Sequence, residues 1–196
     1  MEYVELIKGF FLSPAETFRK VKDTGYGDTF VYFLVLVLIY TVLSVPVMLV
    51  SLSPAWFTGM YTLLGIGSLS GFGIVIIAVL MIIAALVLLF IGAAWLHLWV
   101  YLFGGRKGIR ETLKALAFGE TPALMLGWIP VVGILAGIWA LVLSVMGVRE
   151  LHGISTARAT GAVIVAVVIP LLLLILLAAF LFIAYTETGP LPVTGY

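Results

Sequence analysis

The chain contains no cysteine and very little charge. Without thiols it can form neither disulfides nor thiolate metal sites, and it has no cysteine nucleophile. Charged residues make up 10% of its 196 residues and hydrophobic residues 64%. A soluble domain has about 25% charged residues, which it needs to cover its water-facing surface. The composition therefore predicts an integral membrane protein.

The net charge and the N-terminus exclude two further classes. A formal net charge of +1 points to no strongly acidic or basic partner, so we expect no nucleic-acid binding. The first residues, "MEYVELIKGFFLSPAETF", carry acidic groups early, a short apolar run and no small-residue cleavage site. They do not fit a secretory signal, and we expect them to remain in the mature protein.

Long uncharged runs predict an all-α fold with five transmembrane helices, because a span needs about 20 mostly apolar residues. The second run is longer than the hydrocarbon core is thick, so it must tilt or project from the bilayer. The spans form one domain, 29–185, which a loose Pro/Gly-rich tail follows at 186–196. Residues 51–71 are expected to be a loop or an interfacial helix. The predicted spans are 29–50, 72–103, 110–129, 131–148 and 160–185.

The segment 1–28, before the first span, is amphipathic. Its apolar residues recur at helical spacing and its basic residues occupy other faces, which predicts two short helices. The second helix begins at "SPAE", where Ser13 can cap, Pro14 suits the first helical position and Glu16 completes a capping box. Two arrangements, which are compatible with each other, remain open: the apolar faces dip into the membrane interface, or they pack on the cytoplasmic end of the bundle.

The ten Lys and Arg residues all fall on one side of this five-span topology. They precede the first span or lie between spans two and three or four and five. The positive-inside rule makes that side cytoplasmic, with the N-terminus inside and the C-terminus outside. Two roles remain open for the basic loops: they contact anionic lipid headgroups, or they only set the topology. The headgroup candidates are Arg106, Lys107, Arg110 and Lys114.

Small residues form a stripe along the fourth span. They recur in steps of four, seven and three, which keeps them on one helix face. In lipid, small residues let helix backbones approach closely, within one chain or between chains. A homo-oligomer therefore remains open. The stripe consists of Gly133, Gly137, Ser144 and Gly147.

Two ionisable side chains, His97 and Glu120, fall inside the predicted spans. At about 1.5 Å per residue each lies roughly 9–15 Å from the inner interface, so adjacent antiparallel spans bring them to similar depth. Pro122 lacks an N–H group and frees the carbonyl of Phe118, which predicts a kinked or broken helix there. These four residues form a candidate intramembrane polar site.

Three interpretations of this polar site remain. It is a structural pair or a capped carboxyl group, a proton or cation site of a small transporter or channel, or, least favoured, a catalytic site. One Glu and one His are too few ligands for a metal ion. The sequence shows no Ser/His/Asp arrangement and no phosphate-binding loop. We therefore predict no enzymatic activity, no metal and no cofactor.

Three stretches of the second half carry a resemblance: "LFGG" before a basic segment, "ALAFGETPALM", and "IPVVG" followed by "IWALVLSVMGVRELHGIS". They resemble the Yip1 domain of the YIP family in its prokaryotic form. The N-terminal stretch "SPAETFRKV", ahead of the first span, also resembles prokaryotic members. The resemblance implies five spans, a cytoplasmic N-terminus and a non-enzymatic membrane-organising, membrane-shaping or adaptor role.

The resemblance also bears on partners. Eukaryotic members interact with small GTPases of the Rab class, but their Asp-Leu-Tyr-Gly-Pro signature is absent here. A small-GTPase partner is therefore not carried over to this chain. We expect a multi-pass protein of the cell membrane whose partners are the lipid bilayer and its anionic lipids.

Overall fold

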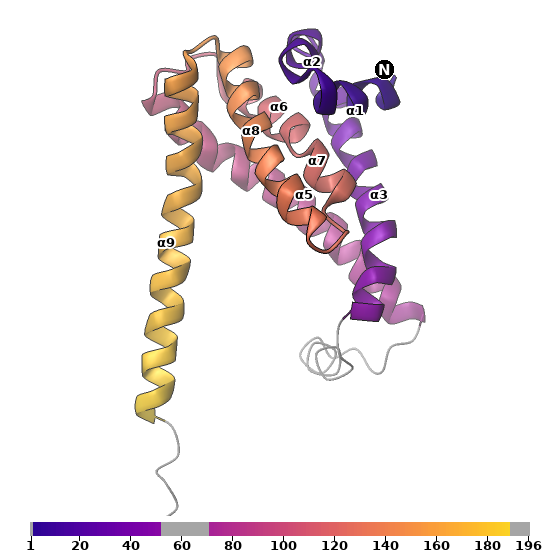
Figure 1. Ribbon diagram of the computed structural model, residues 1–196, viewed down its shortest axis with the longest axis vertical. Helices are drawn as coiled ribbons and strands as arrows, with labels where there is room; N and C mark the ends of the chain where they lie inside the picture. Colours follow the sequence, from indigo (N-terminus) through magenta and orange to yellow (C-terminus); the bar gives the residue numbers. More distant parts are fainter. Residues whose placement is uncertain (1, 52–70, 189–196) are drawn as a thin grey trace, which may run out of the picture.

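The computed structural model describes residues 2–51 and 71–188, which are almost entirely helical and contain no strand (Figure 1). The all-α prediction is confirmed for these residues. The connection predicted at 51–71 and the tail predicted at 186–196 lie outside the described residues, except for residues 51, 71 and 186–188. The helices are α1 (Tyr3–Leu12), α2 (Pro14–Lys20), α3 (Tyr26–Ser51), α5 (Gly71–Leu102), α6 (Ile109–Gly119), α7 (Thr121–Leu126), α8 (Val132–His152) and α9 (Thr156–Thr188).

Four helices of the described part are long and apolar enough to cross a membrane: α3, α5, α8 and α9. They correspond to the first, second, fourth and fifth predicted spans. The third predicted span, 110–129, instead contains two short helices, α6 and α7, which meet at Glu120. Two causes are visible in the sequence. Charged residues occupy the first half of α6, and Gly119 and Pro122 flank the junction.

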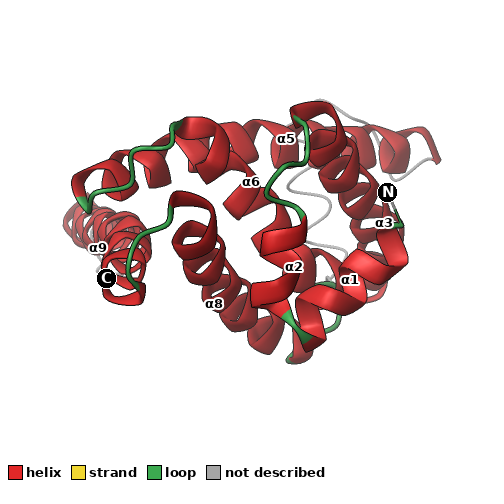
Figure 2. Cartoon of the chain, turned by 90° about the horizontal axis from the view of Figure 1, so that it is seen from above, coloured by secondary structure: helices red, strands yellow, loops and turns green. Residues whose placement is uncertain are grey.

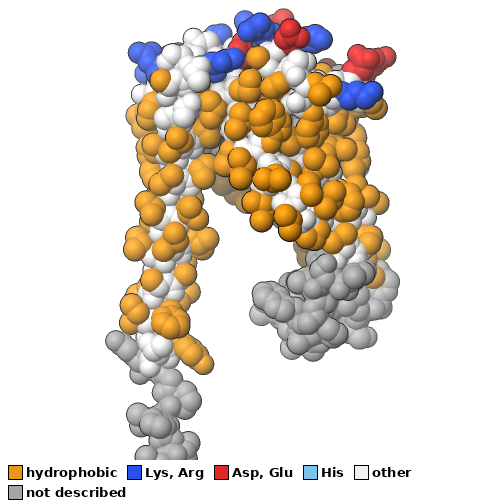
Figure 3. Space-filling view, in the orientation of Figure 1, with side chains coloured by type: hydrophobic (Ala, Val, Ile, Leu, Met, Phe, Trp, Pro, Cys, Tyr) orange, Lys and Arg blue, Asp and Glu red, His pale blue; other side chains and the backbone are white. Residues whose placement is uncertain are grey.

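The charged side chains gather at one end of the molecule (Figure 3). We call this the charged end; it comprises α1, α2 and the loops 103–108 and 153–155 (Figure 1). From it α3 leads away, α5 returns on a diagonal, α6 and α7 lead part of the way, α8 returns and α9 leads away again. The clustering agrees with the one-sided distribution predicted for the basic residues. That this end faces the cytoplasm remains a prediction.

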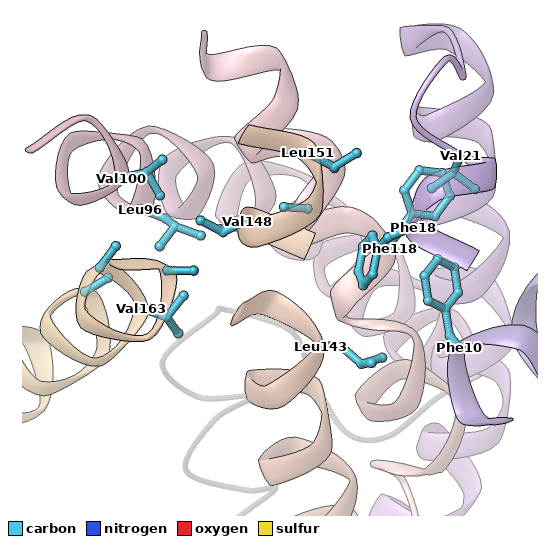
Figure 4. Close-up of a cluster of buried hydrophobic side chains, with 14 of the residues drawn as sticks. Phe10, Phe18, Val21, Leu96, Val100, Phe118, Leu143, Val148, Leu151 and Val163 are labelled. Carbon is cyan, nitrogen blue, oxygen red and sulfur yellow. The ribbon is translucent and has the colours of Figure 1, made fainter. Parts of the chain in front are cut away.

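The two N-terminal helices pack onto the bundle, which is the second of the two predicted arrangements. Phe10 of α1 and Phe18 of α2 are fully buried, and Phe10 lies 4.9 Å from Phe18 and 5.6 Å from Phe118 between ring centroids (Figure 4). Val4 and Leu12 remain 63% and 83% exposed. An apolar edge of α1 therefore faces away from the bundle.

The start of α2 corrects one local prediction. Pro14 does occupy the first turn, but Ser13 makes no side-chain cap. Its carbonyl instead accepts a hydrogen bond of 2.9 Å from the hydroxyl of Thr17. The predicted capping box with Glu16 is therefore wrong, because the hydroxyl that bonds at this helix end comes from the next turn.

The centre of the bundle is the short helix α6. It lies between α5 and α8 (Figure 2), and seven of its eleven residues are buried. In contrast, α9 stands at the opposite edge of the molecule from α1 and α2. Its first half packs on α5 and α8, whereas residues 171–183 are all exposed. Helix α9 thus packs on the bundle near the charged end and stands apart from the other helices further along (Figures 1 and 3).

Candidate intramembrane polar site

His97 lies in a hydrogen-bonded cluster near the charged end. Its Nδ1 atom is 2.8 Å from the hydroxyl of Thr112, and the same hydroxyl is 2.9 Å from Nε2 of His152. The three residues come from α5, α6 and α8, so one hydroxyl joins three helices. Thr112 is fully buried, and His152 is 4% exposed.

The proton positions in this cluster follow from the number of available donors. A threonine hydroxyl donates one hydrogen bond, so it serves one imidazole as donor and the other as acceptor. The Nδ1 atom of His152 is buried and has no partner among the described residues. We assign the proton of His152 to Nε2, because the other tautomer would bury an unpaired N–H group. His152 then donates to Thr112, which donates to Nδ1 of His97.

Thr112 and His152 were not among the sequence candidates. His152 fell in a predicted connection after residue 148, but α8 continues to it and ends at Gly153 in the left-handed conformation. A glycine directly after a basic or histidine residue is a common helix end, and this was the available signal. Thr112 gave no signal, because a threonine near a helix start is ordinary.

Glu120 takes no part in the histidine cluster. It follows Thr112 by eight residues, which is about 12 Å along a helix. No hydrogen bond or ion pair involves its carboxyl group within the described residues. Its neighbours one helical turn away, Leu116 and Leu124, pack against a cluster that α3 and α5 build with Phe33 and Leu89. The structure therefore does not bring His97 and Glu120 together.

The carbonyl of Phe118, which Pro122 frees, has a different partner from the predicted one. The Thr121 hydroxyl donates to it at 2.6 Å. Because that donor is used, the hydroxyl of Tyr32, 2.9 Å away, must donate to Thr121. This buried chain from α3 to the α6–α7 junction satisfies the carbonyl without the carboxyl group of Glu120.

A second proline-freed carbonyl occurs in α9. Pro170 provides no N–H group for the carbonyl of Ala166, four residues earlier. The indole N–H of Trp95 on α5 donates to that carbonyl at 2.8 Å. Pro122 lies in the first turn of α7, just after α6 has ended, whereas Pro170 lies inside the continuous helix α9. The bond fixes α5 against α9 at the point where α9 leaves the bundle.

Three of the four small residues on α8 face neighbouring backbone or rings. A Cβ atom on Gly133 would lie 2.6 Å from the carbonyl oxygen of Gly127, and one on Gly147 would lie 2.8 Å from the Phe18 ring. Ser144 is buried against Gly119. Around Gly137, by contrast, no described residue outside its own turn of α8 places an atom within 4 Å of such a Cβ position. The stripe thus packs within the chain except at Gly137.

The four basic headgroup candidates have different surroundings. Lys114 is 6% exposed, pairs with Glu111 at 3.0 Å and donates to the carbonyl of Lys22. This placement removes it from the headgroup candidates. Arg110 lies over the ring of Tyr26, and Arg106 lies over the ring of Tyr101. Lys107 is exposed in loop 103–108. In the described part of the chain, no three His, Asp or Glu side chains are grouped as metal ligands.

Apolar helices of spanning length, charges at one end and a polar interior at the helix junctions define a multi-pass α-helical membrane protein. The Yip1 domain family model matches residues 8–181, and the chain therefore belongs to the Yip1 domain family. A comparison of the chain with curated proteins finds no match, and a comparison with solved structures finds none either.

Proposed function

We propose that this Yip1 domain protein organises or shapes the cell membrane of a prokaryote and catalyses no reaction. One observation carries the proposal: α1 and α2 are held at the charged end by Phe10 and Phe18, while Val4 and Leu12 face outward. With the charged end in the cytoplasm, these helices lie at the level of the inner headgroups. Amphipathic helices at that level add area to a single leaflet.

The separation of the helices at the other end supports the same role. Near the charged end α5, α6, α8 and α9 pack together, whereas further along α9 stands apart (Figure 1). With the charged end in the cytoplasm, residues 171–183 of α9 would contact lipid in the outer leaflet, whereas packed protein fills the level of the inner leaflet. A protein that occupies the two leaflets unequally favours curved membranes. This is the physical basis of the proposed shaping role.

The test compares vesicle shape for two matched variants. We expect wild-type protein, reconstituted in liposomes, to reduce vesicle diameter or form tubules in electron micrographs. The change Val4→Gln with Leu12→Gln removes the outward apolar edge without touching the core, and should abolish the effect. The control, Glu5→Gln with Glu16→Gln, alters polar positions on the same helices and should retain it. Unchanged vesicles with wild-type protein, or equal effects of both variants, would contradict the shaping role.

An adaptor role makes a different prediction. It requires a protein partner that co-purifies with the chain in a fixed ratio and leaves vesicles of pure lipid unchanged. The transport alternative requires Glu120 to face a cavity or another polar side chain inside the bundle, and no described residue bonds its carboxyl group. His97 bonds to Thr112 instead, so we do not propose transport.

A further inference from the structure

Loops 103–108 and 153–155 at the charged end approach each other through two basic side chains, Lys107 and Arg158. A Cβ atom on Gly153 would lie 3.2 Å from Nζ of Lys107, so Lys107 of the first loop reaches the second. A Cβ atom on Gly104 would lie 3.4 Å from an Nη atom of Arg158, so Arg158, at the start of α9, reaches the first loop. Gly104 and Gly153 have positive φ angles, 99° and 67° respectively, that residues with side chains rarely adopt. Glycine at these positions thus leaves room for both cations.

No carboxylate neutralises this pair of loops. Residues 103–108 and 153–158 contain no Asp or Glu. The nearest acidic residues in sequence are already paired: Glu150 with Arg19 and Arg149, and Glu111 with Lys114. Lys107 and Arg158 form no ion pair within the described residues. An anion from outside can supply the partner that both cations lack among the described residues.

Exposed apolar side chains flank the same junction. Leu102, directly before the first loop, is 62% exposed, and Ile109, directly after it, is 46% exposed. The ring of Tyr101, 51% exposed, lies beneath Arg106. A soluble anion would not contact these apolar side chains. A phospholipid can place its phosphate on the cations and its acyl chains beside the apolar side chains.

We propose that the junction of loops 103–108 and 153–155 binds the headgroup of an anionic phospholipid, with Lys107 and Arg158 as the phosphate ligands. Arg158, at the end of the second predicted basic connection, was not named among the headgroup candidates. This site is independent of the proposed shaping role, since it lies at the α9 edge of the charged end, away from α1 and α2 (Figure 2).

The test counts lipids retained by the full-length protein. Wild-type protein in neutral detergent is incubated with equal amounts of phosphatidylglycerol and phosphatidylcholine, and native mass spectrometry measures the bound lipid. We expect preferential retention of phosphatidylglycerol. Because each cation near an anionic surface contributes about a five-fold affinity gain, Lys107→Gln with Arg158→Gln should weaken retention by roughly 25-fold. The exchange Lys107→Arg with Arg158→Lys keeps both charges and should preserve the preference.

A matched control separates the site from general charge. Lys8→Gln with Lys20→Gln also removes two positive charges, but from exposed positions on α1 and α2. This variant should retain phosphatidylglycerol as wild type does. Equal retention by the loop variant and wild type, or equal losses in both double variants, would overturn the site. Displacement of the lipid by inorganic phosphate at the same concentration would overturn its assignment to a lipid. If the loop double variant loses its thermal unfolding transition, Lys107→Gln alone decides the question by the same comparison.

Discussion

The α6–α7 unit and α9 are two proline-containing regions with opposite surroundings. In α6–α7 the helix is divided at Glu120 and most of α6 is buried. The Thr121 hydroxyl, itself bonded to Tyr32, satisfies the freed carbonyl. In α9 the helix continues through Pro170, Trp95 satisfies the freed carbonyl, and residues 171–183 are exposed. In both regions a side-chain hydroxyl or indole replaces the backbone donor that proline lacks. Burial, not the proline, therefore distinguishes the two regions.

The largest expected effect compares two phenylalanines, one from each region. Phe118 is fully buried, whereas Phe180 is 67% exposed. Phe118→Ala should lower the free energy of unfolding by about 3–5 kcal/mol, because it leaves a cavity among packed rings. Phe180→Ala should leave it nearly unchanged, since lipid contacts that side chain. Unfolding in micelles by titration with sodium dodecyl sulfate measures the free energy of unfolding of both variants. Similar losses in the two variants would contradict the burial of Phe118 in the core.

The next comparison uses two glycines of α8. Gly147→Val would push into the Phe18 ring and the backbone of Ala115, and should cost about 1–3 kcal/mol. Gly137→Val enters open space and should cost little. The same titration checks this pair. If Gly137→Val is the more damaging change, then the small-residue stripe serves contacts between chains instead of contacts to α2 and α6.

The two proline-freed carbonyls can be compared by removing their donors. Thr121→Val leaves both the Phe118 carbonyl and the Tyr32 hydroxyl without a partner, whereas Tyr32→Phe leaves the carbonyl bonded. We therefore expect Thr121→Val to cost about 1–3 kcal/mol and Tyr32→Phe about 1 kcal/mol. Equilibrium unfolding of both variants measures the order, and the reverse order would contradict the assigned direction of the hydrogen bonds.

In α9 the corresponding change has a built-in rescue. Trp95→Phe removes the indole donor to Ala166 and should cost about 1 kcal/mol. Pro170→Ala restores a backbone N–H to the same carbonyl, so Trp95→Phe should cost less in that background. A double-mutant cycle in unfolding free energy measures the coupling. Strict additivity would mean that Trp95 contributes only packing.

The smallest effect is expected at Glu120. No described residue pairs with its carboxyl group, and burial of an unpaired charge is unfavourable, so Glu120→Gln should leave stability unchanged or slightly raised. The unfolding midpoint of this variant is compared with that of Glu150→Gln, which loses bonds to Arg19 and Arg149 and should fall. A fall at Glu120 alone would reveal a partner of its carboxyl group.

Long helices and the helix junction were predictable from the sequence, whereas side-chain contacts between different helices were not. Hydrophobic runs predicted four of the long helices, and Pro122 predicted the junction near Glu120. The pairing of His97 with Glu120 did not follow, because similar depth does not determine the direction in which side chains point. Thr112, Trp95 and Arg158 contact residues 40 to 71 positions away or in another loop, and no local pattern records such contacts.

The depth of α1 in the membrane tests the central claim most directly. The chain has no cysteine, so Leu12→Cys and Glu16→Cys each introduce one site for a spin label. The account predicts that a label at residue 12 is relaxed more by lipid-soluble oxygen than by a water-soluble nickel complex, whereas a label at residue 16 shows the reverse. Equal, water-like exposure at both residues would place α1 outside the membrane and contradict the proposed shaping role.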